Sequence, residues 1–142
     1  MTTAVKYRFV RKAGPELGRQ IIGLYSSQGW WTRGEGLREL NRLIRGSHCF
    51  AVAESGGAVV GIGRAISDRA GDAYLQDIAV SPALRGKGAG RGLVAALCRR
   101  LRADGVAWIG LIAQNGSAGF YARLGFRVLK NAAPMLVKGA RV

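Results

Sequence analysis

The segment Ser81-Pro82-Ala83-Leu84-Arg85-Gly86-Lys87-Gly88-Ala89-Gly90-Arg91-Gly92 follows an apolar run and leads into a stretch whose apolar residues recur at helical spacing. The first turn of a helix presents backbone N–H groups that have no partner within the helix, and it carries partial positive charge. Glycines let a backbone approach an oxyanion closely, and Arg85, Lys87 and Arg91 add positive charge. The segment therefore predicts a pyrophosphate site where a strand passes through a loop into a helix.

Two other phosphate-binding loops do not match this segment. A Walker A loop requires Ser or Thr directly after its lysine, whereas Gly88 follows Lys87. The dinucleotide-binding fingerprint, counted from Gly86, requires a glycine where this sequence has Arg91. A glycine turn that only shapes the backbone stays open as the alternative.

Apolar spacing and turn residues predict the elements on both sides of the segment. The predicted helices are one that opens at Gly14-Pro15-Glu16 and three that cover Leu37 to Ile44, Gly90 to Asp104 and Ser117 to Leu124. The predicted strands are Val5 to Val10, His48 to Glu54, Ala58 to Ala65, Ala73 to Val80, Val106 to Ala113, Phe126 to Lys130 and Met135 to Lys138. This order predicts an α/β (α+β) fold, a single domain over residues 1–142 with a mixed sheet of about seven strands and about four helices.

Positive charge is the unusual bulk property of the 142-residue chain. Lys and Arg number 22 against 8 Asp and Glu, so the formal net charge is +14. Such a field attracts polyanions, and nucleic acid stays open as a partner beside the alternative of a solvated, arginine-rich surface. Apolar runs are too short for a membrane span and the first residues lack the pattern of an export signal, so we expect no membrane partner and a cytoplasmic location.

Residues that commonly carry metal or redox chemistry are few. Cys49 and Cys98 have apolar neighbours and no CxxC spacing, so we expect buried, reduced thiols. His48 is the only histidine and has no metal-ligating neighbour in the sequence, so we expect no metal site.

The hexapeptide Arg85 to Gly90 resembles the signature Arg/Gln-x-x-Gly-x-Gly/Ala of the GNAT superfamily of acyl-CoA-dependent N-acyltransferases. Leu75 to Pro82 is similar to the strand that precedes this signature in the family. Gly119 to Phe126 is similar to the downstream Phe-Tyr-x-x-x-Gly-Phe element of the family. The resemblance covers roughly the whole chain and is firmest from Tyr74 to Phe126.

The resemblance implies a mostly antiparallel sheet whose fourth and fifth strands splay apart and hold the pantetheine arm of acetyl-CoA, the co-substrate. The backbone of Ile78 and Val80 would pair with that arm, and the amides from Arg85 to Gly90 would hold its pyrophosphate. Family members often carry an asparagine one position before Asn115, where this chain has Gln114. The cofactor-binding residues expected on this basis are Ile78, Ala79, Val80, Arg85, Gly86, Lys87, Gly88, Ala89, Gly90, Arg91, Asn115 and Tyr121.

Attack of an amine on a thioester needs an unprotonated amine and help for the departing thiolate. Asp77 is the candidate for an electrostatic anchor or a water-linked proton acceptor, and a carboxylate paired to a nearby arginine is the alternative. The resemblance implies that Tyr121 donates a hydrogen bond to the CoA sulfur, and a packed aromatic ring is the alternative.

Acceptor selection is predicted from aromatic and polar residues near this strand. Trp30 and Trp31 lie in a glycine-flanked loop, while Tyr74 and Gln76 occupy the alternation face of their strand opposite to Asp77. The predicted function is an acetyl-CoA-dependent N-acetyltransferase acting on a small-molecule amine or a protein or peptide amine, with homodimer formation as a possibility. A non-catalytic acyl-CoA-binding or nucleic-acid-associated module on the same fold is the alternative.

Overall fold

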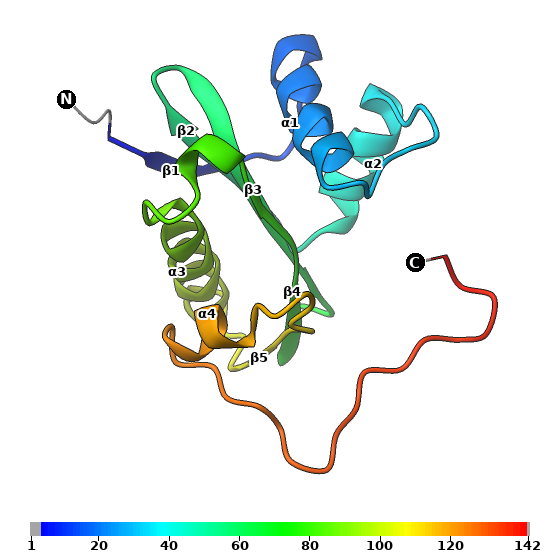
Figure 1. The fold of residues 1–142 in the computed structure, drawn as a ribbon, viewed down its shortest axis with the longest axis vertical. Helices are drawn as coiled ribbons and strands as arrows, with labels where there is room; N and C mark the ends of the chain where they lie inside the picture. Colours follow the sequence, from blue (N-terminus) through cyan, green and yellow to red (C-terminus); the bar gives the residue numbers. More distant parts are fainter. Residues whose placement is uncertain (1–3, 142) are drawn as a thin grey trace. The chain divides into compact units, whose positions relative to one another are not determined.

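The computed structural model describes residues 4–141, which fall into two compact units divided after Leu111. The first unit holds most of the secondary structure (Figure 1). Its elements are β1 (Lys6–Phe9), α1 (Pro15–Ser27), α2 (Leu37–Gly46), β2 (Cys49–Ser55), β3 (Ala58–Ser67), β4 (Asp72–Val80), the short 3₁₀ helix η1 (Pro82–Leu84), α3 (Ala89–Ala103) and β5 (Trp108–Gly110). The second unit contains α4 (Ala118–Ala122).

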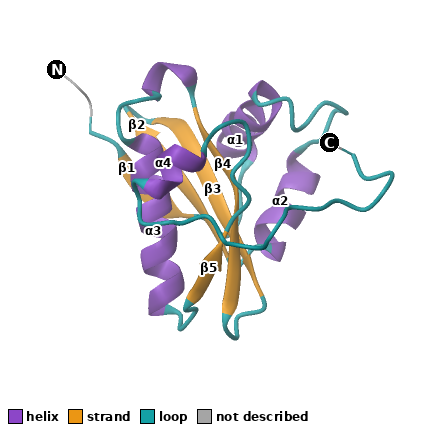
Figure 2. Ribbon diagram, turned by 60° about the horizontal axis from the view of Figure 1, so that its bottom comes forward, coloured by secondary structure: helices purple, strands orange, loops and turns teal. Residues whose placement is uncertain are grey.

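The sheet has the order β1-β2-β3-β4-β5, antiparallel from β1 to β4 and parallel between β4 and β5. This arrangement confirms the predicted α+β fold with a mixed, mostly antiparallel sheet. Helix α3 lies on one face of the sheet, and α1 and α2 lie on the other (Figures 1 and 2). The four predicted helices are all present in the described residues, with bounds shifted by a few positions.

Each face of the sheet is covered by one apolar helical stripe. On the α1 side, Ile21 and Tyr25 pack with Leu40 of α2 against Phe50 and Ile62 of the strands. On the α3 side the buried residues recur at positions three and four apart, as predicted from the sequence. They are Ala89, Leu93, Val94, Ala96, Leu97, Cys98 and Leu101. The two cysteines are buried free thiols, as predicted.

A β-bulge interrupts β4 in the middle of the sheet. The register with β3 passes from Ile62 opposite Ala79 to Arg64 opposite Gln76, so one strand carries an extra residue between these pairs. Asp77 occupies this position with φ of +58°, in the left-handed region. A Cβ at Gly63 would lie 2.7 Å from Ile78 Cδ1, so glycine in β3 makes room for the shifted strand.

Strands β4 and β5 pair only over a short ladder. Asp72, Ala73 and Tyr74 face Trp108, Ile109 and Gly110, and within residues 4–141 no strand pairs with Leu75 to Val80 on this side of β4. Strand β4 therefore pairs with β5 only near its start, and the predicted divergence toward Ile112, which belongs to the second unit, stays a prediction. The fifth strand is also shorter than the predicted Val106 to Ala113, because β4 supplies no hydrogen-bond ladder beyond Gly110.

The two closing strands predicted at Phe126 to Lys130 and Met135 to Lys138 are not formed. These residues have no strand partner within the described structure, and the sheet has five strands instead of about seven. Their apolar side chains are exposed, with Val128 81% and Met135 87% accessible. A β-rich pattern becomes a strand only where a neighbouring edge supplies hydrogen bonds, and that edge is not encoded in the pattern.

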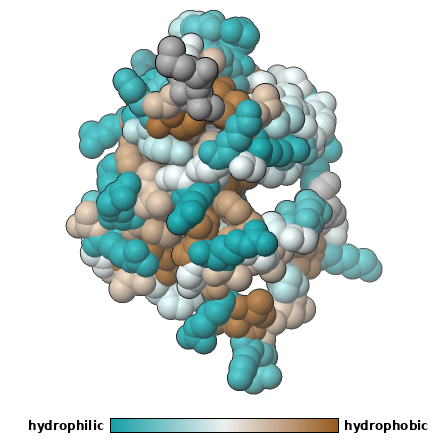
Figure 3. Space-filling view, turned by 60° about the vertical axis from the view of Figure 1, so that its left-hand side comes forward, coloured by the Kyte–Doolittle hydropathy of each residue, from teal (hydrophilic) through white to brown (hydrophobic). Residues whose placement is uncertain are grey.

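Hydrophilic side chains are distributed over the face shown in Figure 3, with apolar surface between them. Among residues 4–141, no helix is both long enough and apolar enough to cross a membrane.

Close contact between β1 and α3 gives the first testable prediction. A Cβ at Gly92 would lie 2.0 Å from the Tyr7 hydroxyl and 2.1 Å from Cζ of its ring, whereas a Cβ at Gly23 in α1 meets nothing within 4 Å. Gly92→Ala should destabilise the protein by about 1–3 kcal/mol because the tyrosine ring must move. Gly23→Ala should instead stabilise it by about 0.5–1 kcal/mol, the ordinary gain in a helix. Urea unfolding measures both.

A Tyr7→Ala background serves as the control for this contact. Removing the ring should abolish the cost of Gly92→Ala, so a penalty that persists in the double variant would contradict the assignment.

Candidate active site

The glycine-rich loop after β4 is shaped by left-handed backbone. Gly86 has φ of +77° and Gly88, the N-cap of α3, has φ of +89°. A Cβ at either position would meet nothing within 4 Å, so these glycines are required by backbone conformation and leave open surface above the loop. Helix α3 begins at Ala89, one residue before its predicted start.

The N-terminus of α3 is ready to receive an anion. No side chain caps it, and its first turn contains no acidic residue. Gly92 N–H donates to the Gly88 carbonyl at 3.0 Å, and the three preceding amides donate to no other residue in the described part of the chain. Arg85, Lys87 and Arg91 are all exposed around this turn. The arrangement combines unpaired N–H groups, partial positive charge and three cations at one place.

The edge of β4 beyond its short ladder with β5 presents backbone groups next to this loop. Ser81 N–H donates to the Val60 carbonyl of β3 at 2.8 Å, so by strand alternation the peptide groups of Val80 and Ile78 face away from β3. The Val80 carbonyl accordingly accepts a bond from Arg85 Nε at 3.3 Å. The side chain of Ala79, which lies between these two residues, is buried in the core on the α1 side.

Asp77 forms part of a partly buried polar cluster. The Tyr25 hydroxyl donates to Asp77 Oδ2 at 2.8 Å, and Arg64 Nε donates to the same oxygen. Burial raises the pKa of Tyr25 above its usual value, and the neighbouring Asp77 carboxylate raises it further, so the phenol stays protonated and donates. The predicted alternative of a carboxylate paired to an arginine is therefore observed, and a role for Asp77 in proton transfer stays a prediction.

The bulge changes which residues share a face with Asp77. Arg64 reaches both Asp77 and, through Nη2 at 3.4 Å, Oε1 of Gln76. The expectation that Gln76 lies on the face opposite to Asp77 is wrong, because the extra residue interrupts the two-residue alternation. Tyr74, before the bulge, is 49% exposed and its ring contacts Trp108 edge-on.

Sequence reasoning did not identify Tyr25 and Arg64 as site residues. In the sequence, Tyr25 follows Leu17, Ile21 and Leu24 at helical spacing, which indicates only a core position. The signal for Arg64 was a lone cation within the apolar run of β3.

The two tryptophans of the loop after α1 have different environments. Trp31 stacks on Tyr25 with ring centroids 4.4 Å apart and packs against the core. Trp30 contacts Tyr25 edge-on at 6.0 Å and remains 43% exposed. Tyr25 thus connects the aromatic pair to Asp77, and Trp30 is the ring that a ligand can reach.

Two predicted site residues, Asn115 and Tyr121, belong to the second unit. Asn115 and Gly116 have φ of +55° and +75° in a turn closed by a bond from Ser117 N–H to the Gln114 carbonyl. The Tyr121 ring packs edge-on against Phe120 and Phe126, and burial raises the pKa of its phenol. Their predicted roles toward acetyl-CoA remain predictions.

A family model described as "Acetyltransferase (GNAT) family" matches residues 18–126. The chain therefore belongs to the GNAT family of acetyl-CoA-dependent N-acetyltransferases, as the loop and its neighbouring strand had suggested.

Curated relatives are similar over part of their length. Serotonin N-acetyltransferase 2, chloroplastic, of Oryza sativa subsp. japonica is 37% identical over 54% of this chain. GCN5-related N-acetyltransferase 2, chloroplastic, of Arabidopsis thaliana is 37% identical over 57% of it. The matches span 38% and 30% of these two relatives, respectively.

Solved structures resemble the chain over almost its whole length. Glucosamine-6-phosphate N-acetyltransferase of Arabidopsis thaliana has a TM-score of 0.75 at 19% identity, covering 95% of this chain and 99% of its own. A predicted acetyltransferase with acetyl-CoA from Clostridium acetobutylicum has a TM-score of 0.72 at 16% identity, covering 94% and 97%. At these identities the likeness concerns the fold.

The Tyr25–Asp77 bond gives a second prediction. Tyr25→Phe keeps the stacked ring but removes a hydrogen bond to a partly buried carboxylate, so it should lower the free energy of unfolding by about 1.5–3 kcal/mol. Tyr74→Phe is the matched control, because its exposed hydroxyl bonds to no residue in the described part of the chain, and it should change stability by less than about 0.5 kcal/mol. Equal effects in urea unfolding would show that the bond contributes nothing.

Proposed function

We propose that the protein transfers the acetyl group of acetyl-CoA to a primary amine, which attacks the thioester directly. The observation that carries this proposal is the uncapped, acid-free N-terminus of α3 beside the unpaired edge of β4. A pyrophosphate suits the first, and an extended arm with amide groups suits the second. Both features lie in the first unit, where β4 leads through the glycine-rich loop into α3.

Different residues of this surface would bind different parts of acetyl-CoA. Amides at the start of α3 would hold the diphosphate, while Arg85, Lys87 and Arg91 attract it through their charge. Peptide groups of Ile78 and Val80 would pair with the pantetheine arm, which requires Arg85 Nε to release the Val80 carbonyl. Bound acetyl-CoA would supply the acetyl group as an activated thioester, so this chain needs no residue to activate acetate.

The acceptor amine must lose a proton before it attacks. For a lysine-like ammonium with a pKa of about 10.4, neutralisation at pH 7 costs about 4 to 5 kcal/mol. Asp77 is the candidate residue to bind the ammonium or to accept its proton through water. Both of its protein bonds end at Oδ2, which leaves Oδ1 for the amine or for water. We assign Asp77 to anchoring the ammonium, whose proton then passes through water bound at Oδ1 to solvent so that the neutral amine attacks.

Tyr121 is the proposed hydrogen-bond donor to the departing CoA sulfur. A phenol with a pKa near 10 or above is protonated at neutral pH, and burial raises the pKa of Tyr121 further. The thiolate produced has a lower pKa, near 8.5 with cysteine as a guide, so hydrogen bonding is favoured over full proton transfer.

The acceptor is proposed to be an amine with an apolar or aromatic body. Trp30 exposes its ring beside Tyr25, whose hydroxyl contacts Asp77, so an aromatic wall and a carboxylate lie near one another. Tyr74 and Gln76 extend this surface along β4. A relative named for serotonin acetylation supports this class, whereas another named a histone acetyltransferase points to a protein amine.

The reaction itself can be tested by release of free thiol. The protein would be incubated with acetyl-CoA and arylalkylamines, polyamines, amino acids and peptides, while a thiol reagent follows the CoA produced. Arylalkylamines should be acetylated faster than polyamines, which the net positive charge repels. Stabilisation by CoA without thiol release from any amine would contradict catalysis and favour a binding module.

A glycine substitution tests the phosphate loop. Gly88→Ala and Gly57→Ala both place Ala at a φ above +75° with open space around the Cβ, so each should cost about 1–2 kcal/mol of stability. Only Gly88→Ala should weaken the binding of CoA, by about tenfold, because of the two glycines only Gly88 is the N-cap of α3. Calorimetric titration with CoA measures the affinity, and equal CoA affinities in the two variants would contradict the assignment.

Removing one hydroxyl tests the role of Tyr121. Tyr121→Phe should lower kcat by about tenfold to a hundredfold while leaving the Kd for CoA nearly unchanged, since the bond forms as the thiolate departs. An unchanged kcat would leave the ring as a packed aromatic residue only.

A further inference from the structure

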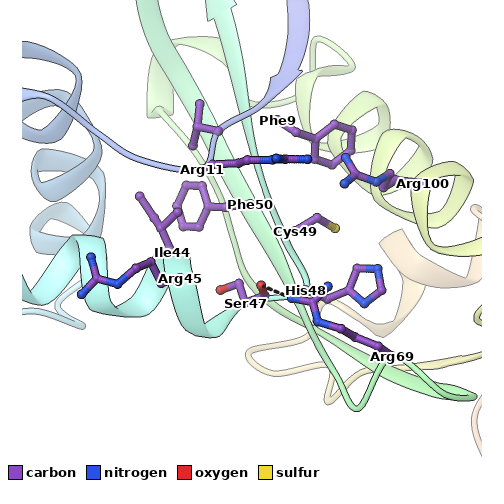
Figure 4. A pocket seen from close by; sticks show the side chains of 11 residues that line it. Phe9, Arg11, Ile44, Arg45, Ser47, His48, Cys49, Phe50, Arg69 and Arg100 are labelled. Carbon is purple, nitrogen blue, oxygen red and sulfur yellow. Dashed lines mark hydrogen bonds between the residues drawn. The ribbon is translucent and has the colours of Figure 1, made fainter. Parts of the chain in front are cut away.

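A cavity lies in the first unit, away from the surface proposed for acetyl-CoA. It has a volume of about 570 Å³ and is lined near the end of β1, the start of β2, the β3–β4 turn and the last turns of α3 (Figure 4). Arg100, one of its lining residues, is eleven positions along α3 from Ala89, or about 16 Å at the rise of a helix. The volume is that of a site for a small organic ligand.

Positive charge converges on this cavity from separate elements. Arg11, Arg69 and Arg100 line it together with His48, and in Figure 4 these three guanidinium groups lie around the Cys49 and His48 side chains. Arg45 also lines the cavity, but its guanidinium points away from the others in this view. Like charges repel one another here, so an anion bound between these guanidinium groups would lower the electrostatic energy of the cavity.

The negative charge near the cavity is too small to offset the positive charge of the arginines that line it. No Asp or Glu is among the lining residues, and Asp104, which contacts Arg100 and His48, is the carboxylate that reaches them. Arg11 and Arg69 form no ion pair within residues 4–141. Burial raises the pKa of the Cys49 thiol to about 11, so this group stays neutral and offsets nothing.

Two of the guanidinium groups are held in place before any ligand arrives. Arg100 stacks on the Phe9 ring at 4.9 Å and donates through Nε to Asp104 at 3.0 Å. Arg69 donates through Nη2 to the Ser47 carbonyl at 3.3 Å, and its own N–H is bound by Ser67 Oγ. Their remaining N–H donors are free to bind a ligand at low entropic cost.

His48 supplies an independent sign that a polar partner belongs here. Its residue is 8% exposed, Nε2 contacts Asp104 Oδ2 at 2.8 Å, and Nδ1 is buried without a hydrogen-bond partner in the described structure. Because Asp104 accepts the Nε2 proton, Nδ1 is an acceptor in the neutral ring and a donor in the charged one. A phosphate group matches either form, since its oxygens accept and its monoprotonated form can donate.

We propose that this cavity binds a small phosphate-bearing anion, such as a polyphosphate or a phosphate ester, between Arg11, Arg69, Arg100 and His48. A monocarboxylate offers two oxygens in one plane, too few for three guanidinium forks that approach from different elements. A diphosphate offers more oxygens and more charge, arranged tetrahedrally. Nucleic acid is disfavoured because the charge lines a concave cavity instead of an extended surface. This proposal is independent of acetyl transfer.

Pyrophosphate is the probe, measured by calorimetric titration with the loop site saturated by CoA. Pyrophosphate should bind at one further site. The double variant Arg11→Gln/Arg69→Gln should lower the affinity of this site for pyrophosphate by about tenfold or more. Arg99→Gln/Arg102→Gln, which removes the same charge from exposed positions on α3, should weaken it by less than about threefold. Unchanged thermal unfolding and CoA affinity would verify that both variants are folded.

Each other outcome overturns the proposal. Absence of pyrophosphate binding in the CoA-saturated protein, or equal weakening in the two double variants, would leave only a general positive field. Malonate binding as tightly as pyrophosphate would overturn the choice of phosphate, and displacement of pyrophosphate by a short DNA duplex would assign the cavity to nucleic acid. Loss of thiol release, by contrast, bears on the proposed function alone.

Discussion

The bulge at Asp77 and the polar contacts that hold it are the constraint on which the rest of the site depends. A non-glycine residue at φ of +58° inside a strand costs free energy, and it persists here because Arg64 and Tyr25 both bind the side chain that the bulge turns inward. The same extra residue brings Gln76 and Asp77 to one face of the sheet. A regular strand would not turn the Asp77 carboxylate toward both Arg64 and Tyr25.

The aromatic residues extend this constraint to the acceptor side. Tyr25 is buried on α1, stacks on Trp31 and donates to Asp77, so the loop that carries the tryptophans is coupled to the bulge through one ring. A residue of the hydrophobic core therefore also sets the position of the candidate anchor for the amine. Core packing and site geometry are not separable here, because a shift of α1 along the sheet would move the phenol away from the carboxylate.

Sequence reasoning captured the features that are local and missed those that depend on distant partners. The loop from Arg85 to Gly90 was predictable because glycine, cation and helix start are written consecutively. Asp77 was recognised as a candidate, but its pairing with Arg64 across β3 and its shift of face arise from a bulge that leaves no mark in an alternating pattern. Likewise, the apolar residues near Val128 and Met135 suggested strands, yet the hydrogen-bonding edge that a strand needs comes from elsewhere in the chain.

The two proposed anion sites lie near opposite ends of α3 and would hold their anions by different physical means. At the N-terminus the helix itself provides unpaired amides and partial positive charge, to which Arg85, Lys87 and Arg91 add side-chain cations. At the C-terminus the helix carries partial negative charge, which opposes an anion, and Asp104 adds to that opposition. An anion can be held there only by side-chain cations that outweigh both terms. The proposed cavity site would therefore depend on guanidinium groups from the β1–α1 loop, the β3–β4 turn and α3, whereas the proposed loop site would combine backbone amides with side-chain cations.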